Sequence, residues 1–274
     1  MGEPNATTGQ RVVRLWLWLH LALVLVFLLA PIVAIAPLSF SAGSFLQYPL
    51  PGLSLRWYVD FFTSGFWLPA LGNSMVVAIA ATVLATVLGT LAAIGLWLAP
   101  FPAKGLVTAA LLAPMVVPII VVAVGVYFAF AAAGIANSRF GLILAHTALG
   151  APFVVVTVQA TLAGFDRTLM RAGASLGANP WTVFRRVMLP LVLPGVASGA
   201  LFAFATSFDE VVVAFFLTGP GQRTLPRQMF AGINENISLT IAAAATMLVL
   251  MSVAMMAAVE YLRRRGERLR RGRA

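Results

Sequence analysis

The segment SLGANPWTVFRRVMLP, residues 175–190, is a polar interruption in a chain that is apolar over most of its length. Gly177 is a residue type that closes a helix, and Asn179 followed by Pro180 is a typical helix start. Good helix formers precede the glycine from Thr168 on. These signals predict a short helix-turn-helix, whose second helix is expected to end at Pro190 because proline interrupts a helix.

The composition around this segment is that of an integral membrane protein. Of the 274 residues, 61% are hydrophobic and 9% are charged, with a mean hydropathy of +0.97, whereas soluble domains carry about 25% charged residues. A spanning helix needs roughly 20 apolar residues, because backbone groups in hydrocarbon must be satisfied within the helix. The predicted spans are residues 15–38, 70–98, 105–133, 141–163, 191–217 and 239–261.

The sequence therefore predicts an all-α membrane protein with six transmembrane helices. We expect residues 1–14 to form an N-terminal tail, residues 15–262 the transmembrane domain and residues 263–274 a basic tail. The first apolar run is too long for the core of a signal peptide and is predicted to be a retained helix. The polar segment between the fourth and fifth spans, residues 164–190, is expected to lie at the membrane surface.

The distribution of positive charge predicts the orientation of these spans. With six spans both termini share a side, and that side holds 14 of the 18 Lys and Arg residues. They are Arg11, Arg14, Lys104, Arg167, Arg171, Arg185, Arg186 and the seven arginines of residues 263–273; the other side holds Arg56, Arg139, Arg223 and Arg227. Because positive loops stay cytoplasmic, both termini and residues 164–190 are predicted to be cytoplasmic.

Several chemistries are excluded or unsupported by the sequence. There is no cysteine, so disulfides and cysteine-ligated metals are excluded. His20 and His146 belong to different predicted spans, with no acid at metal-ligand spacing, and no phosphate-binding glycine loop occurs. We expect no catalytic site, no metal and no cofactor in this chain. The basic tail is interpreted as a topology anchor that attracts anionic lipid, since nothing supports nucleic-acid binding.

Two of the predicted spans carry residues that disturb a membrane helix. Pro114 and Pro118 each remove a hydrogen bond in the third span, which predicts a bend that acts either as a gate or only as a kink. In the fifth span, Asp209 and Glu210 are adjacent in apolar surroundings. An ionised carboxylate there costs a few kcal/mol. Either these acids line a pathway for a cationic or polar solute, or they contact another helix or subunit.

The helix-turn-helix has two physical interpretations. Trp181 and Phe184 fall near one face of its second helix, with Arg185 and Arg186 beside them. An aromatic knob with basic flanks suits a groove on another protein. An amphipathic helix of this kind also suits a position on lipid headgroups.

A resemblance to a known family favours the first interpretation. The segment resembles the EAA loop of membrane subunits of ATP-binding-cassette importers, in which Glu-Ala-Ala is followed by a glycine, an aromatic residue and Leu-Pro. The matching residues are Arg171-Ala172-Gly173, Gly177, Phe184 and Leu189-Pro190. AHTALGAPFVVVTV in the fourth span, FDEVVVAFFLTGPG in the fifth and the LPRQMF that follows resemble the second permease subunit of spermidine/putrescine importers.

The resemblance implies the type I importer permease fold and a subunit that performs no chemistry itself. It implies a bacterial inner membrane location, a sister permease that completes a heterodimer, two cytoplasmic ATPases that bind ATP and Mg, and a solute-binding protein on the outer face. The ATPase-coupling residues would be Arg171, Ala172, Gly173, Gly177, Trp181, Phe184, Arg185 and Arg186, and the pathway residues Asp209 and Glu210. Arg171 departs from the motif glutamate, and Ile119 stands where polyamine permeases tend to carry an acid.

The alternative function is an ion-coupled secondary transporter. It would use Asp209, Glu210 and His146 as a proton relay and would need no ATPase. No inverted repeat between the two halves of the chain supports it.

Overall fold

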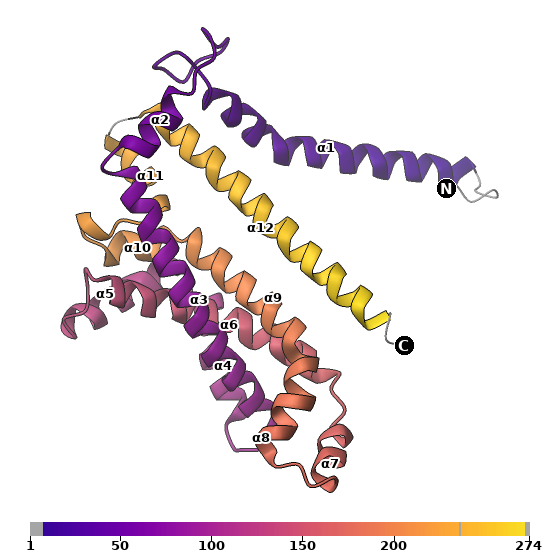
Figure 1. The fold of residues 1–274 in the computed structure, drawn as a ribbon. Coiled ribbons are helices and arrows are strands. Elements are labelled where there is room, and N and C mark those ends of the chain that lie inside the picture. Colours follow the sequence, from indigo (N-terminus) through magenta and orange to yellow (C-terminus); the bar gives the residue numbers. More distant parts are fainter. Residues whose placement is uncertain (1–7, 236, 272–274) are drawn as a thin grey trace. The chain divides into compact units, whose positions relative to one another are not determined.

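The computed structural model describes residues 8–235 and 237–271, and over this part of the chain the regular structure is helical apart from a bridge between Ser41 and Leu53. The α-helices, labelled in Figure 1, are α1 (Thr8–Leu38), α2 (Arg56–Thr63), α3 (Trp67–Leu98), α4 (Lys104–Val116), α5 (Ile119–Ala132), α6 (Arg139–Ala163), α7 (Thr168–Ser175), α8 (Pro180–Val183), α9 (Leu189–Phe208), α10 (Val212–Leu217), α11 (Leu225–Glu235) and α12 (Leu239–Arg271). Two short turns complete the elements: the π turn η1 (Phe184–Met188) and the 3-10 turn η2 (Pro220–Gln222). Of the predicted tails, residues 1–7 and 272–274 lie outside the described residues, and α12 continues through the basic segment to Arg271.

The prediction of an all-α membrane protein is confirmed at the level of helix type and length. Within the described residues, five helices are long and apolar enough to cross a membrane: Val12–Leu38, Trp67–Leu98, Arg139–Ala163, Pro180–Phe208 and Leu239–Ala257. A sixth is counted if the bent pair α4 and α5 is one span. These segments match the predicted spans closely except at the third and the fifth.

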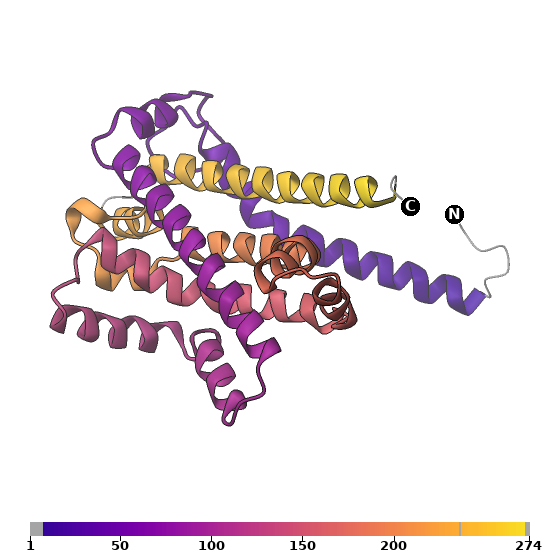
Figure 2. The same ribbon diagram turned by 60° about the horizontal axis from the view of Figure 1, so that its bottom comes forward.

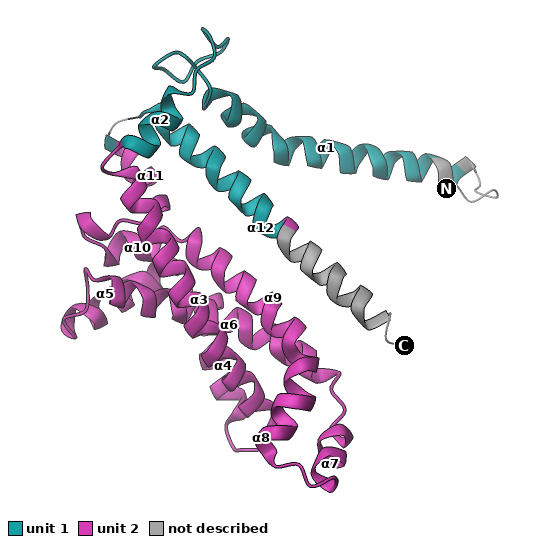
Figure 3. Ribbon diagram, in the orientation of Figure 1, with its two compact units in different colours: residues 1–63, 235–256 teal, residues 64–234, 257–274 magenta. Residues whose placement is uncertain are grey.

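The chain divides into two compact units, coloured separately in Figure 3. The first contains residues 1–63 and 235–256. In it, Leu38, Leu239 and Ala242 form a small buried cluster against Leu50 and Trp57. The Thr240 hydroxyl donates a 2.6 Å hydrogen bond to the Asp60 carboxylate. These contacts join the ends of α1 and α12 through the connection that carries α2.

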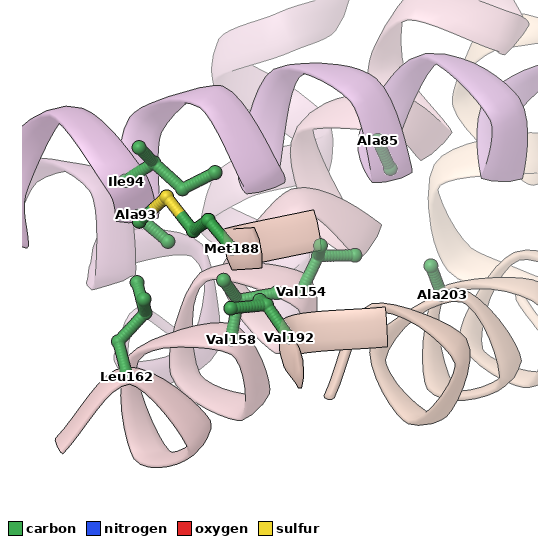
Figure 4. Close-up of a cluster of buried hydrophobic side chains, with 9 residues drawn as sticks. All are labelled: Ala85, Ala93, Ile94, Val154, Val158, Leu162, Met188, Val192 and Ala203. Carbon is green, nitrogen blue, oxygen red and sulfur yellow. The ribbon is translucent and has the colours of Figure 1, made fainter. Parts of the chain in front are cut away.

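The second unit, residues 64–234 and 257–274, is built around α3, α6 and α9. Figure 4 shows the buried cluster to which all three helices contribute. Small residues bring the backbones together: a Cβ added to Gly199 of α9 would lie 2.7 Å from the Val154 Cα of α6, and one added to Gly89 of α3 would lie 2.7 Å from the Val154 Cβ. Small side chains allow the close backbone approach on which membrane helix packing depends.

The third predicted span is broken between α4 and α5, at a bend of 107° visible in Figure 2. The helix ends at Val116, and Val117 is extended because a residue before proline is driven out of the helical region. The predicted bend is therefore confirmed, and it falls at Pro118. Pro114 is accommodated inside α4.

Two expectations about the fifth span are wrong. It does not run from 191 to 217 as one helix: α9 ends at Phe208, and α10 begins only at Val212. At its other end, Pro190 does not terminate the preceding helix, because residues 184–188 form a π turn in which the Leu189 N–H bonds to the Phe184 carbonyl. Because Pro190 falls at the first positions of α9, directly after this wider π turn, the helix continues past the proline.

Candidate functional site

The segment between α6 and α9 lies at one end of the second unit, and α10 lies at the other (Figure 1). Its first half ends as the sequence predicts. Gly177 has a φ of +81°, its N–H bonds to the Ala174 carbonyl, and the Ala178 N–H bonds to the Gly173 carbonyl. This pair of bonds is the Schellman motif, which favours glycine in the left-handed position. The turn between α7 and α8 is therefore fixed by local sequence.

Two side chains accept hydrogen bonds from backbone N–H groups at the helix starts of this loop. The Asn179 Oδ1 accepts a 2.8 Å hydrogen bond from the Thr182 N–H at the start of α8. Before α7, the Asp166 carboxylate accepts bonds of 2.8 Å from the Thr168 N–H and 2.6 Å from its hydroxyl. These two bonds lower the pKa of Asp166 below its ordinary value, because they favour the ionised carboxylate.

The aromatic residues of the loop differ in exposure. Trp181 is 65% exposed, whereas Phe184 is partly buried against the α3/α6/α9 core. Their rings stack with centroids 5.4 Å apart. Phe184 thus packs between the core and the Trp181 ring, and the Trp181 ring is exposed.

The outer surface of the loop combines this tryptophan with exposed cations. Trp181, Thr182, Arg185 and Arg186 line a shallow pocket, and both arginines are exposed. Leu176, next to Gly177, is 89% exposed and was not among the predicted docking residues. Its place at the tip of a turn depends on the left-handed Gly177, which is the signal that could have identified it.

The remaining predicted loop residues lie on α7. Arg171 and Ala172 are exposed, whereas Gly173 is half-buried. A Cβ at Gly173 would lie 3.2 Å from a methyl of Val183, so the small residue lets α7 pack against α8. The structure therefore brings the predicted coupling residues together on one short loop, but it divides them into outward-facing residues and packing residues.

At the opposite end of the unit, the break between α9 and α10 separates the two acids. Asp209 is exposed, and Glu210 is buried. The Glu210 carboxylate accepts hydrogen bonds from the N–H groups of Val213 (2.8 Å) and Ala214 (2.9 Å) at the start of α10. A carboxylate in this position satisfies donors that have no partner inside the helix. Glu210 has a structural role in this arrangement, and Asp209 is available to other groups.

His146 of α6 lies beside this cap. Its Nδ1 is 2.8 Å from the Ser207 hydroxyl of α9, and its Nε2 is 3.6 Å from the Glu210 Oε2. All three side chains are buried. His146 and Glu210 were predicted as candidate residues, grouped only in the alternative proton relay, whereas Ser207 was not predicted. The tertiary packing of α6 against α9 joins them.

The connection from α10 to α11 is hydrogen-bonded to the start of α3. The Asn73 Nδ2 donates to the carbonyls of Gly221 (3.2 Å) and Arg223 (3.1 Å), and the Leu225 N–H donates 2.8 Å to the Ser74 hydroxyl. In the described part of the chain, no group of three or more His, Asp or Glu side chains is arranged to hold a metal.

Comparison with known proteins places these features in a transport context. Residues 85–268 match the family model for binding-protein-dependent transport system inner membrane components. The chain is 33% identical to the spermidine/putrescine transport system permease protein PotC of Escherichia coli K12, over 87% of this chain and 90% of that protein. It is 31% identical to the putrescine transport system permease protein PotI of the same organism, over 85% of each.

Solved structures share the fold at low sequence identity. A chain of a bacterial ABC transporter that imports the acidic polysaccharide alginate superimposes with a TM-score of 0.75 at 15% identity, over 94% of this chain and 99% of that one. A chain of the MetNI methionine ABC transporter gives a TM-score of 0.59 at 16% identity, over 73% and 95%. These likenesses support the type I importer permease fold and carry no information about the solute.

Proposed function

Because this chain belongs to the family of binding-protein-dependent transport system inner membrane components, we propose that it forms half of the pathway of an importer for a small cationic solute of the spermidine/putrescine type. The permease relatives PotC and PotI carry spermidine/putrescine and putrescine in their names. The ion-coupled secondary transporter finds no support in these relatives and is not retained.

The proposed assembly contains this permease, a sister permease, two cytoplasmic ABC ATPases and an extracytoplasmic solute-binding protein. The ATPases bind ATP and Mg, and this chain contributes no catalytic residue. Both termini and the loop of residues 164–190 face the cytoplasm, as the excess of positive charge on that side indicates. The Arg167 side chain bonds to the end of α3, which supports a common side for the α3 end and the loop.

The loop of residues 164–190, here called the coupling loop, is the proposed contact with one ATPase. Its outward surface combines Trp181 and Leu176 with Arg171, Arg185 and Arg186. Aromatic and arginine side chains dominate binding energy at protein interfaces. A partner surface with an apolar groove and acidic rim groups would fit them. Arg171 replaces the motif glutamate, so the partner contact at this position is proposed to have reversed charge.

The observation that supports a cationic solute is the exposure of Asp209 directly beside a buried, hydrogen-bonded Glu210. An exposed carboxylate at the break between two helices is positioned to contact a cation without first losing a structural partner. Ile119, where polyamine permeases tend to carry an acid, removes one other source of negative charge. We therefore propose Asp209 as the principal acid of this chain in the pathway.

Uptake by the assembled transporter tests this proposal. Asp209→Asn is expected to lower uptake of a radiolabelled polyamine about tenfold, which corresponds to about 1.4 kcal/mol of lost cation binding. Glu235→Gln is the matched control, because it removes an exposed acid at the end of α11. Wild-type uptake by Asp209→Asn at equal membrane levels would remove Asp209 from the pathway, and failure of the wild-type complex to take up any polyamine would reject the solute class.

A further inference from the structure

Arg167 connects the start of the coupling loop to a helix that the loop does not continue. The residue lies between the end of α6 and the start of α7. Its Nη2 donates a 2.6 Å hydrogen bond to the Trp97 carbonyl in the last turn of α3. Its guanidinium carbon also lies 4.3 Å from the centroid of the Trp97 ring. One side chain thus makes two different contacts with the same residue of α3.

The acceptor, the Trp97 carbonyl, has no hydrogen-bond partner within the helix because it lies in the last turn. The carbonyls of the last helical turn have no partner within the helix, and a cation is favoured there by the helix dipole. The hydrogen bond from a guanidinium is charge-assisted, and a planar guanidinium stacks on an aromatic face in a way that an ammonium does not. Both contacts therefore fix the position of Arg167 and favour arginine over lysine.

Trp97 is itself held by the core. Its ring meets the Phe165 ring edge-to-face with centroids 5.5 Å apart, and both rings pack against the buried cluster of α3, α6 and α9. Arg167 therefore contacts a side chain that packs against the core shared by α3, α6 and α9. Arg185 and Arg186 lack such an attachment, because in the described part of the chain neither side chain makes a hydrogen bond.

The covalent connections of the coupling loop reach only α6 and α9. A force applied to α7 and α8 would therefore act directly on those two helices, while α3 would follow only through side-chain packing. We propose that Arg167 is a positioning residue that fastens the coupling loop to α3, so that α3, α6 and α9 move as one body when the loop is displaced. This inference rests on the proposed coupling function and names the residue through which α3 takes part.

The first test measures solute uptake and ATP hydrolysis by the complete transporter in proteoliposomes. Arg167→Gln is expected to lower the solute transported per ATP about fivefold or more, as for loss of an allosteric coupling. Arg167→Lys, which keeps the charge and a donor, is expected to restore part of this ratio. Lys104→Gln is the control, since it removes an exposed charge at the start of α4 without a side-chain hydrogen bond.

A reference variant separates the role of Arg167 from the coupling function of the loop. Trp181→Ala tests the coupling loop itself and leaves the Arg167 contacts in place. If Trp181→Ala lowers the ratio while Arg167→Gln leaves it at the wild-type value, the role of Arg167 is rejected and the coupling loop is retained. If both variants keep the wild-type ratio, the coupling function is rejected as well. Ratios are compared per assembled complex, so a lower yield does not affect the comparison.

The second test follows the geometry directly. The chain has no cysteine, so spin labels on cysteines placed at Leu98 and Ser175, both exposed, report the distance between the end of α3 and the coupling loop. We expect the same narrow distance distribution with and without ATP in the wild type. In Arg167→Gln the distribution should broaden or shift between the two states. An identical distribution in wild type and variant would overturn the proposal.

Discussion

The two ends of the second unit differ in the exposure of the polar residues discussed above. At the coupling-loop end, Trp181, Arg185 and Arg186 are exposed and make few contacts within the chain. At the end where α9 breaks, Glu210, His146 and Ser207 are buried and contact one another or backbone donors. The exposed ring and cations at the first end are available to a partner, whereas the buried polar residues at the second end hold the fold. Asp209 is the exception, since it is exposed beside the buried cluster.

This difference determines how substitutions should be interpreted. A change at an exposed position removes an interaction with something outside the chain and leaves the fold intact. A change at a buried position also leaves donors or acceptors unsatisfied, which costs about 1–3 kcal/mol for each group. Adjacent residues such as Asp209 and Glu210 can therefore give opposite results, one affecting transport and the other stability.

The largest effect is expected for Glu210→Ala. It removes the acceptor of two buried N–H groups at the start of α10, so the free energy of unfolding should fall by roughly 3 kcal/mol. Glu210→Gln keeps one carbonyl acceptor and should lose about half as much. Thermal unfolding of the purified protein measures both losses, with Asp209→Ala as the matched neighbour that should unfold like the wild type. Equal losses at positions 209 and 210 would show that the two acids do not differ in role.

A smaller effect, confined to transport, is expected at the exposed end. Trp181→Ala removes the presented ring, and Gly177→Asp places a charge on the outward turn and strains its left-handed backbone, so each should lower uptake per ATP about tenfold, equivalent to about 1.4 kcal/mol at an interface. The protein level in the membrane should not change. Leu106→Ala, which truncates an exposed apolar residue of α4, should retain wild-type coupling. Normal uptake by both loop variants would contradict docking at this surface.

The smallest effect is expected at the Asp166 cap. Because the pKa of Asp166 is lowered in the folded loop, its contribution to stability is present above the unfolded pKa and is lost as the pH falls through the folded pKa. Between about pH 5 and pH 8 the cap should therefore be constant. Hydrogen exchange at the Thr168 amide measures it: Asp166→Asn should preserve protection, since asparagine also caps, and Asp166→Ala should lose it. A change in the protection of the wild-type Thr168 amide across this pH range would show that the ionised Asp166 carboxylate does not hold this bond.

The coupling loop was predictable because its signals are local. Gly177, Asn179 and Pro180 specify a helix end and a helix start through local conformation, and the structure forms the expected turn with the Asn179 cap. Pro118 likewise breaks the third span through its own ring and its effect on Val117. The apolar runs identify the spans because hydrocarbon imposes a minimum length on each of them.

The all-helical membrane chain, its approximate spans and the helix-turn-helix of residues 164–190 each follow from hydropathy or from the conformational preferences of neighbouring residues. No such local rule predicts that Pro190 lies within a continuing helix, that α9 ends at Phe208, or that Ser207, His146 and Glu210 lie together. These features depend on which backbones approach each other. That approach is set by glycines such as Gly199 and Gly89 on different helices, whose pairing with Val154 no local pattern specifies.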